Sequence, residues 1–266
     1  MPWIAVADLD DRRLDAYRHL KRTNETARRG LFIAEGDKLV RRLLDSPLEV
    51  ESVLVDERYV DAFRELVPPQ VPAFVVPNDR VEQLVGFNFH RGILACGRRP
   101  GSPPLKSVLD PPAASRLIVV CPNVQDPENL GAIVRLCRAF AVDGLLLGGE
   151  CADPFSRRVQ RVSMGCVYRL PIVVAIDMVA ALQVLREQHA VESWAAYLSS
   201  DAETFEPARR ARRLALVFGS EGHGLPPEIA AACDRRVMIP MPPGVDSLNV
   251  AVTAGIMLYE CTKVAS

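Results

Sequence analysis

The stretch I-P-M-P-P-G-V-D-S-L-N-V-A-V, residues 239–252, joins an apolar strand pattern to the last helical pattern of the chain. Its prolines fix the backbone φ angle and leave neighbouring carbonyl groups without a partner in a β-ladder. Ser247 or Asn249 can cap the following helix, which is the ordinary structural role of either side chain. A helix cap explains only one polar residue, however, whereas this stretch contains three: Asp246, Ser247 and Asn249. The stretch therefore predicts a rigid loop that carries a preorganised polar cluster.

A glycine-rich loop, G-S-E-G-H-G-L-P-P at residues 219–227, follows an apolar strand pattern that ends at Phe218. Its glycines allow a ligand to approach the backbone closely. Their spacing does not match G-x-G-x-x-G, and no Lys-Ser or Lys-Thr follows as in a phosphate-binding loop. Taken alone, the loop is explained either by a tight turn or by a ligand site of another kind.

A third segment, C-P-N-V-Q-D-P-E-N-L-G-A-I-V-R at residues 121–135, links an apolar strand to a helix. Asn129 lies at the start of that helix. Arg135 projects from its second turn, at about 120° from Asn129 around the helix axis. An arginine in this position often extends along buried neighbours toward solvent, so spacing alone leaves its role open.

Short apolar runs alternate with helical patterns around these three loops, which predicts a mostly parallel sheet with helices on both faces. Ligands of parallel sheets bind beyond the carboxyl ends of the strands, where the three loops lie. We expect strands at 116–121, 144–149, 170–175, 192–198, 214–219 and 236–241, and helices at 129–140, 156–165, 178–188, 227–233 and 248–264.

A proline-rich stretch divides the chain into two domains. Residues 98–115 read R-R-P-G-S-P-P-L-K-S-V-L-D-P-P-A-A-S, which is typical of a linker. We expect one domain at residues 1–97 and a second at residues 116–266, both within the usual domain size range. Short strands alternate with helical patterns in the first domain as well, which predicts a small α/β sandwich.

The composition excludes several classes of protein. The chain of 266 residues is 49% hydrophobic and 24% charged, which excludes a disordered protein and a disulfide scaffold. Lys and Arg (32) nearly balance Asp and Glu (33), so attraction to a polyanion requires local patches. No apolar stretch is long enough for a membrane span or a secretory signal, and we expect a cytoplasmic protein.

Metal and redox chemistry are not expected either. The seven cysteines are widely spaced, so the chain offers neither a C-x-x-C redox pair nor a zinc knuckle. Four scattered histidines do not complete a metal site by their spacing. Each cysteine is best explained as a small buried thiol.

Taken together, the loops resemble one family. N-x-x-D-P-x-N-x-G-A-I-x-R, F-G-S-E-G-x-G-L and I-P-M-x-x-G-x-x-S-L-N-V-A-V resemble three motifs of the SpoU or TrmH-type RNA 2′-O-ribose methyltransferases of the SPOUT superfamily, in residue type, order and spacing. P-F-S-R-R-V-Q-R-V-S-M-G, residues 154–165, resembles the basic segment between the first two motifs. The resemblance covers residues 116–264. Glu128 and Ser220 depart from it, where many relatives have Gly and Asn.

This resemblance implies an α/β fold whose last helix is threaded through a loop, giving a deep trefoil knot. It also implies a homodimer without a metal, and an S-adenosylmethionine molecule held in a bent conformation by the backbone of the knot loops. Apolar side chains would flank the adenine, as suits a pocket with few directional groups. By position, the cofactor contacts fall on Phe218, Gly219, Ile239, Met241 and Leu248.

The family's polar active-site positions match Asn129, Arg135, Glu221, Ser247 and Asn249. The reaction must align the ribose 2′-hydroxyl with the sulfonium methyl group and remove the hydroxyl proton. Arg135 is the family's usual candidate for assisting the hydroxyl, but a guanidinium group remains protonated, with a pKa above about 12. We therefore assign Arg135 to orienting the hydroxyl and an adjacent phosphate. Sulfonium is already a good leaving group, so no metal is needed.

Local basic segments are consistent with an RNA substrate. Residues 155–169 carry arginines and no acidic residue, so they can neutralise phosphates without reading the sequence. Residues 11–30 hold a basic excess of four charges as well, which a solvated helix face explains equally well. We expect RNA contacts at Arg157, Arg158, Arg161, Arg22 and Arg28.

The N-terminal domain favours ribosomal RNA as the substrate. L-F-I-A-E-G, residues 31–36, follows a basic stretch and looks like the ribosomal-protein-L30e-like substrate-binding domain of several rRNA members of the family. The resemblance thus predicts methylation of a ribose 2′-hydroxyl in rRNA. A tRNA methyltransferase and a catalytically silent RNA-binding protein remain as alternatives. A nicotinamide-dependent reductase would need G-x-G-x-x-G where C-P-N-V-Q-D stands.

Overall fold

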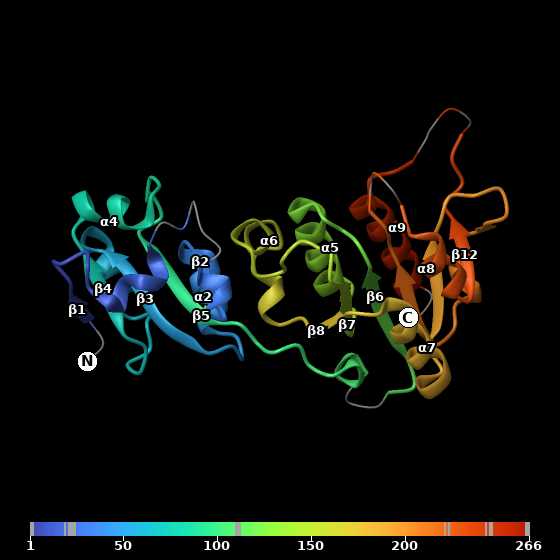
Figure 1. Cartoon of the computed structure of the whole chain (residues 1–266), viewed down its shortest axis with the longest axis horizontal. Helices are drawn as coiled ribbons and strands as arrows, with labels where there is room; N and C mark the ends of the chain where they lie inside the picture. Colours follow the sequence, from blue (N-terminus) through green and yellow to red (C-terminus); the bar gives the residue numbers. More distant parts are fainter. Residues whose placement is uncertain are drawn as a thin grey trace. The chain divides into compact units, whose positions relative to one another are not determined.

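The computed structural model describes residues 3–18, 20, 25–109, 113–220, 222, 224–242, 244 and 247–263. Two compact units make up the chain (Figure 1). The first unit comprises Met1–Gly101 together with Phe155–Arg169, and the second comprises Ser102–Pro154 together with Leu170–Ser266. Within the described residues, no helix is both long and apolar enough to cross a membrane.

The second unit contains the sheet that the sequence predicts. Its seven strands follow the order β10-β12-β9-β11-β6-β7-β8, and each of these neighbouring pairs is parallel. The predicted α/β fold class with a mostly parallel sheet is therefore confirmed. The strands are β6 (Arg116–Cys121), β7 (Gly144–Gly148), β8 (Ile172–Ala175), β9 (Glu192–Ala196), β10 (Glu203–Thr204), β11 (Arg213–Val217) and β12 (Arg235–Met238).

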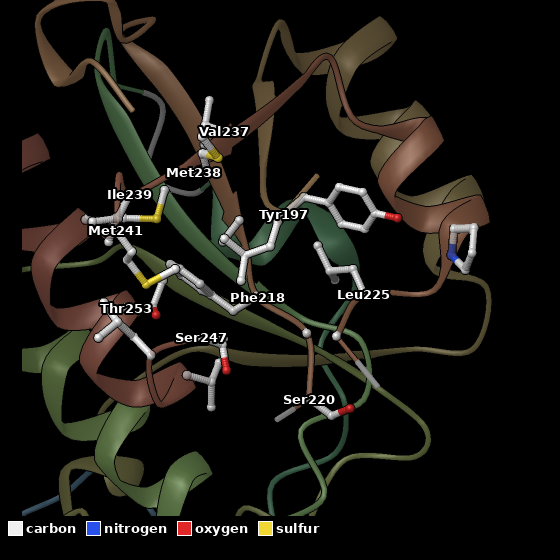
Figure 2. A pocket seen from close by; sticks show the side chains of 18 residues that line it. Tyr197, Phe218, Ser220, Leu225, Val237, Met238, Ile239, Met241, Ser247 and Thr253 are labelled. Atoms are coloured by element: carbon white, nitrogen blue, oxygen red, sulfur yellow. The ribbon is translucent and has the colours of Figure 1, made fainter. Parts of the chain in front are cut away.

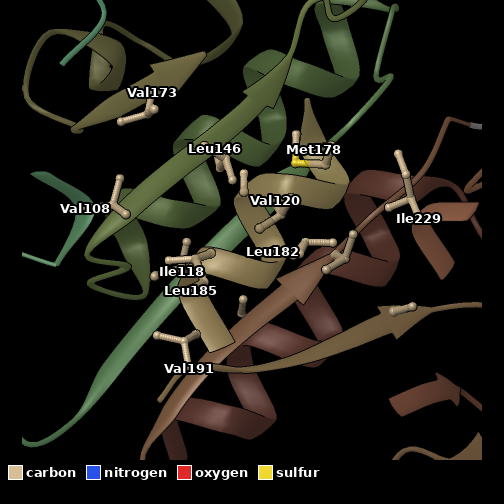
Figure 3. Packing of buried hydrophobic residues seen from close by; sticks show 14 of the residues in the cluster. Val108, Ile118, Val120, Leu146, Val173, Met178, Leu182, Leu185, Val191 and Ile229 are labelled. Carbon is tan, nitrogen blue, oxygen red and sulfur yellow. The ribbon is translucent and has the colours of Figure 1, made fainter. Parts of the chain in front are cut away.

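Helices cover both faces of this sheet. Ile118 and Val120 of β6 point to a core that α7 and α8 close with Leu182 and Ile229 (Figure 3). Val119 points to the other face and is buried as well, because α5 and α9 pack together there. The helices are α5 (Pro127–Ala139), α7 (Met178–His189), α8 (Pro227–Ala232) and α9 (Val250–Lys263), with short 3-10 helices η3 (Leu105–Val108) and η5 (Pro207–Arg209).

The predicted linker, residues 98–115, is shorter in the structure. Arg98 still belongs to a strand of the first unit, whereas Val108 and Leu109 are buried in the core of the second unit. A Cβ atom at Gly144 would lie 2.5 Å from Val108, so the proline-rich segment packs directly on β7. The proline-rich stretch thus contains a short apolar run, Val108 and Leu109, that belongs to the core of the second unit.

The helix predicted at residues 156–165 forms, but it lies in the first unit and not in the predicted catalytic domain. This region contains α6 (Arg157–Val162) and the 3-10 helix η4 (Cys166–Tyr168). The buried Gln160 donates a hydrogen bond to the backbone oxygen of Ile33 (3.1 Å) and accepts one from the Tyr168 hydroxyl (2.6 Å). The Phe32 ring packs against Tyr168 with ring centroids 5.7 Å apart. The segment at residues 155–169 is therefore buried against β2, more than 100 residues earlier in the chain.

The first unit is a smaller α/β fold. Its sheet has the order β1-β4-β3-β5-β2, and β5 runs antiparallel to both of its neighbours. The strands are β1 (Trp3–Ala5), β2 (Leu31–Glu35), β3 (Val50–Asp56), β4 (Ala73–Val76) and β5 (Ile93–Arg98). The helices other than α6 and η4 are α1 (Glu25–Arg28), α2 (Asp37–Leu44), α3 (Val60–Phe63) and α4 (Asn78–Val85), with η1 (Arg12–Tyr17) and η2 (Glu57–Tyr59).

Candidate active site

A cavity of about 430 Å³ opens at the carboxyl ends of β9, β11 and β12 in the second unit (Figure 2). This is the edge at which parallel sheets bind ligands, and the volume is within the range of small-molecule sites. The walls come from the loops after these strands and from the start of α9. All five residues predicted to bind the cofactor line it: Phe218, Gly219, Ile239, Met241 and Leu248.

The glycine-rich loop is both a tight turn and a wall of the cavity. Backbone hydrogen bonds link Ser220 and Gly224 in both directions, at 3.1 and 2.9 Å. Gly224 has a φ of +65°, which favours glycine. A Cβ atom at Gly219 would collide with the backbone of Gly224 and Leu225, so only glycine fits there. The tight turn and the ligand site, which the sequence left open as two explanations of this loop, therefore do not exclude each other.

Asn123, at the carboxyl end of β6, holds this loop in place. Its Oδ1 atom accepts a hydrogen bond from the Ser220 amide (3.1 Å), and its Nδ2 atom donates one to the Gly224 carbonyl (3.2 Å). Nδ2 also lies 3.4 Å from the Ser220 hydroxyl oxygen. The sequence motif contains Asn123, but we did not predict a role for it. Its position, two residues beyond the end of a buried strand and within the first motif, is the signal that could have indicated this role.

Replacing Asn123 should weaken cofactor binding. Asn123→Ala removes contacts that net about 0.5–1.5 kcal/mol each, so we expect the affinity for S-adenosylmethionine to fall about tenfold. Asn123→Asp should be worse, because a carboxylate cannot donate to the Gly224 carbonyl and repels it. Isothermal titration calorimetry measures both. Equal affinity of Asn123→Asp and the unaltered protein would contradict this role.

The first and third motifs meet through two asparagines. The Asn249 side-chain amide donates a hydrogen bond to Oδ1 of Asn129 (2.9 Å). Asn249 also caps α9, because its Oδ1 atom accepts hydrogen bonds from the amides of Ala251 (2.9 Å) and Val252 (3.2 Å). Asn129 is 8% exposed and lies in the first turn of α5, which Asp126 caps. The predicted cap is therefore present, and the same side chain also joins the third motif to the first.

The remaining predicted polar residues are placed differently. Ser247 lines the cavity beside Leu248. Arg135 is exposed on α5 and is not among the described residues that line the cavity. It follows Asn129 by six residues, about 9 Å along the helix axis. Glu221 lies outside the described residues, as does Asp246.

Those of the predicted RNA-contacting arginines that the structure describes belong to the first unit. Arg158 and Arg161 of α6 are exposed, as is Arg28 of α1. Arg157 is half-buried and forms an ion pair with Glu35. Arg22 lies outside the described residues.

The described residues contain no group of three or more His, Cys, Asp or Glu side chains that could hold a metal ion. Burial raises the pKa of the Cys121 thiol well above its usual range, and it also raises the pKa of Cys151. Both thiols are therefore weak nucleophiles at neutral pH.

The second unit is an α/β fold with a cavity at the carboxyl edge of its parallel sheet, the edge at which such sheets bind ligands. Residues 116–259 match the model of the SpoU rRNA Methylase family. The chain is 35% identical over 266 residues to an uncharacterized tRNA/rRNA methyltransferase of Mycobacterium tuberculosis (strain ATCC 25618 / H37Rv), covering 97% of this chain and 91% of that protein. This chain therefore belongs to the SpoU rRNA methylase family.

One further relative and one solved structure are also RNA methyltransferases. The chain is 29% identical over 231 residues to the 23S rRNA (guanosine-2′-O-)-methyltransferase RlmB of Nitrosomonas europaea, covering 84% of this chain and 87% of that protein. A crystal structure of an AdoMet-bound rRNA methyltransferase from Sinorhizobium meliloti superposes with a TM-score of 0.80 at 27% identity, covering 99% of this chain and 98% of that one. The predicted enzyme class and methyl donor are confirmed: an RNA 2′-O-ribose methyltransferase that uses S-adenosylmethionine.

Proposed function

We propose that this enzyme methylates a ribose 2′-hydroxyl of ribosomal RNA, with S-adenosylmethionine held in the cavity at the carboxyl ends of β9, β11 and β12. One observation carries the proposal. The loop after β11 and the loop after β12 are separate in sequence, yet Gly219, Ile239, Met241 and Leu248 line the same cavity. An rRNA substrate is further supported by the similarity to RlmB over both units.

The lining residues fit S-adenosylmethionine. Ile239, Met241 and Leu248 offer apolar surface for an adenine ring. Gly219 has no side chain, so the backbone of the glycine-rich loop can approach the ligand closely. Ser247 and Thr253 add hydroxyl groups to the wall from the third motif and α9, as Figure 2 shows. When bound, S-adenosylmethionine supplies an electrophilic methyl group on its sulfonium.

The polar residues then orient the acceptor ribose. The Asn129–Asn249 hydrogen bond fixes the start of α5 against the start of α9, beside Ser247 and Leu248. We assign Asn129, Ser247 and Asn249 to positioning polar groups of the substrates, and we propose the same role for Glu221 from the motif resemblance alone. Alignment of reacting groups lowers a barrier by about 7–11 kcal/mol in favourable cases.

Arg135 is assigned to the 2′-hydroxyl and an adjacent phosphate. A guanidinium group stays protonated and offers several donors in a fixed plane, which suits an oxygen that develops negative charge. Arg135 is exposed, and it makes no ion pair within the described part of the chain. Its donors are therefore available to an incoming RNA strand.

A homodimer through α9 is part of the proposal. Val252 (49% exposed), Ile256 (37%) and Tyr259 (50%) form an apolar stripe along α9. Their spacing places them on one face of the helix. A second copy of this chain is the occupant that the family resemblance implies. Analytical ultracentrifugation should give twice the monomer mass, whereas a monomer at micromolar concentration would contradict the dimer.

Three further expectations also remain proposals: the trefoil knot, the L30e-like character of the first unit and a cytoplasmic location. The knot is supported by the family resemblance, in which the last helix is the threaded one; that helix, α9, packs against α5 here. The small α/β fold of the first unit, with its mixed sheet, supports an L30e-like domain. A ribosomal RNA substrate supports the cytoplasmic location.

Methyl transfer to isolated RNA tests the proposed function. The purified protein is incubated with S-adenosylmethionine and either ribosomal RNA or tRNA, and digested nucleosides are analysed by mass spectrometry. We expect one 2′-O-methylated nucleoside to appear in ribosomal RNA. Methylation of tRNA alone would contradict the rRNA assignment. Binding of RNA without methylation of either would indicate a catalytically silent protein.

A further inference from the structure

Every exposed residue of α2 and α6 in the first unit is basic. On α2 these are Lys38, Arg41 and Arg42, and on α6 they are Arg158 and Arg161. The other residues of both helices are buried or half-buried. The two helices come from parts of the chain that are far apart in sequence, so the common charge is not the consequence of one local basic run.

These helices lie side by side on β2. Arg157, at the start of α6, pairs with Glu35 at the end of β2, directly before α2. Beyond the end of α6, the Met164 carbonyl accepts a hydrogen bond from Arg42, near the end of α2. The two helices therefore run in the same direction, and their outward side chains share one surface.

The buried contacts hold α6 firmly in this position. Gln160 donates hydrogen bonds to the backbone oxygens of Ile33 (3.1 Å) and Phe155 (2.6 Å). A Cβ atom at Gly165 would lie 3.2 Å from a methyl group of Leu39 on α2, so the segment after α6 packs closely against that helix. A rigid scaffold thus presents the basic side chains.

The carboxylates near this surface are already engaged. Asp37 pairs with Arg41 at 2.7 Å, and Asp45 pairs with Arg169 at 2.7 Å. Glu35 pairs with Arg157.

Within the described residues, Lys38, Arg42 and Arg161 form no ion pair with a carboxylate. Positive charge at this surface therefore exceeds the negative charge that could neutralise it.

Arg157 has a different role from its neighbours. Its guanidinium carbon lies 4.2 Å from the centroid of the Phe87 ring, and its Nη2 atom pairs with Glu35. Stacking and pairing together anchor the start of α6 to the first unit. We assign Arg157 to this anchoring contact, in place of the RNA contact expected from the sequence.

We propose that Lys38, Arg42, Arg158 and Arg161, the α2–α6 face, bind the phosphate backbone of the substrate RNA. The inference rests on the proposed function, because the ligand is the RNA whose ribose is methylated. Ammonium and guanidinium groups neutralise phosphates and release counterions without reading bases. The face therefore sets affinity and orientation, while the choice of nucleotide is made elsewhere.

The double variant Lys38→Gln/Arg161→Gln tests the α2–α6 face. RNA binding is measured across a series of salt concentrations, using an in vitro transcript that the unaltered enzyme methylates. Loss of two phosphate contacts should reduce the salt slope by about two and weaken binding at low salt about tenfold. KM for RNA should rise by a similar factor, whereas kcat and the affinity for S-adenosylmethionine should not change.

A matched control carries the same loss of charge at the other edge of the sheet. Arg13 stacks near Phe74 of β4, and Arg64 stacks near Trp3 of β1. Both are exposed and held in ion pairs, with Asp11 and Asp61. Arg13→Gln/Arg64→Gln should bind RNA within about twofold of the unaltered enzyme, and thermal melting should show both variants folded.

The outcomes separate this inference from the proposed function. An unchanged salt slope in Lys38→Gln/Arg161→Gln, with methylation intact, would overturn the α2–α6 face alone. Equal losses in both double variants would also overturn it, because net charge would then explain the effect. An unaltered enzyme that neither binds nor methylates any RNA would overturn both proposals.

Discussion

Arg135→Ala is expected to abolish methyl transfer while the affinity for S-adenosylmethionine stays within a few-fold of its original value. Arg135 is exposed on α5 and does not line the cavity, so its removal leaves the cofactor walls intact. Loss of a donor to a developing oxyanion reduces turnover on the order of a hundred- to a thousandfold. Single-turnover methylation and isothermal titration calorimetry measure the two quantities separately.

Arg138→Ala provides the matched control on the same helix. Arg138 is also exposed in the last turn of α5, and its replacement should leave turnover within about threefold. Arg135→Lys keeps the charge but loses the planar set of donors, so its rate should stay well below that of the unaltered enzyme. A strong loss of cofactor affinity in Arg135→Ala would mean that this side chain belongs to the cofactor site instead.

Gly219→Ala is expected to eliminate most cofactor binding. The new Cβ atom would collide with the backbone of Gly224 and Leu225, not with a flexible side chain, so the loop itself must move. Because this loop forms one wall of the cavity, we expect the affinity for S-adenosylmethionine to fall about a hundredfold, which corresponds to about 2.8 kcal/mol. Calorimetric titration gives the affinity directly.

Gly222→Ala is the control for the same loop. A Cβ atom at Gly222 meets no atom within 4 Å, so this substitution should change the affinity less than about threefold. Circular dichroism melting checks that both variants fold. Similar cofactor affinities for Gly219→Ala and Gly222→Ala would show that the glycine-rich loop does not form the cofactor wall.

The parallel sheet and the meeting of the loops could be predicted from the sequence because both depend on local patterns. Apolar runs separated by helical patterns specify parallel strands, and such strands bring their carboxyl ends to one edge. The loops after Val217 and Met238 consequently share one cavity. The helix predicted from residue 248 begins at Val250 because Asn249 caps it.

Other features depended on contacts that a local pattern does not contain. Residues 155–169 belong to the first unit because Gln160 and Tyr168 find their buried partners near β2. The hydrogen bonds between Asn123 and Ser220 of the glycine-rich loop join positions that are 97 residues apart. The link between Asn129 and Asn249 spans 120 residues. In each case tertiary packing selects one polar partner among many.

A crystal structure of this protein with S-adenosylmethionine at saturating concentration tests the central claim most directly. We predict adenosyl density within the cavity, against the backbone of Phe218 and Gly219 and between the side chains of Ile239, Met241 and Leu248. The methyl group should point toward the side of the cavity where Ser247 lies. Density at any other place in the molecule, or no binding at millimolar concentration, would contradict the account.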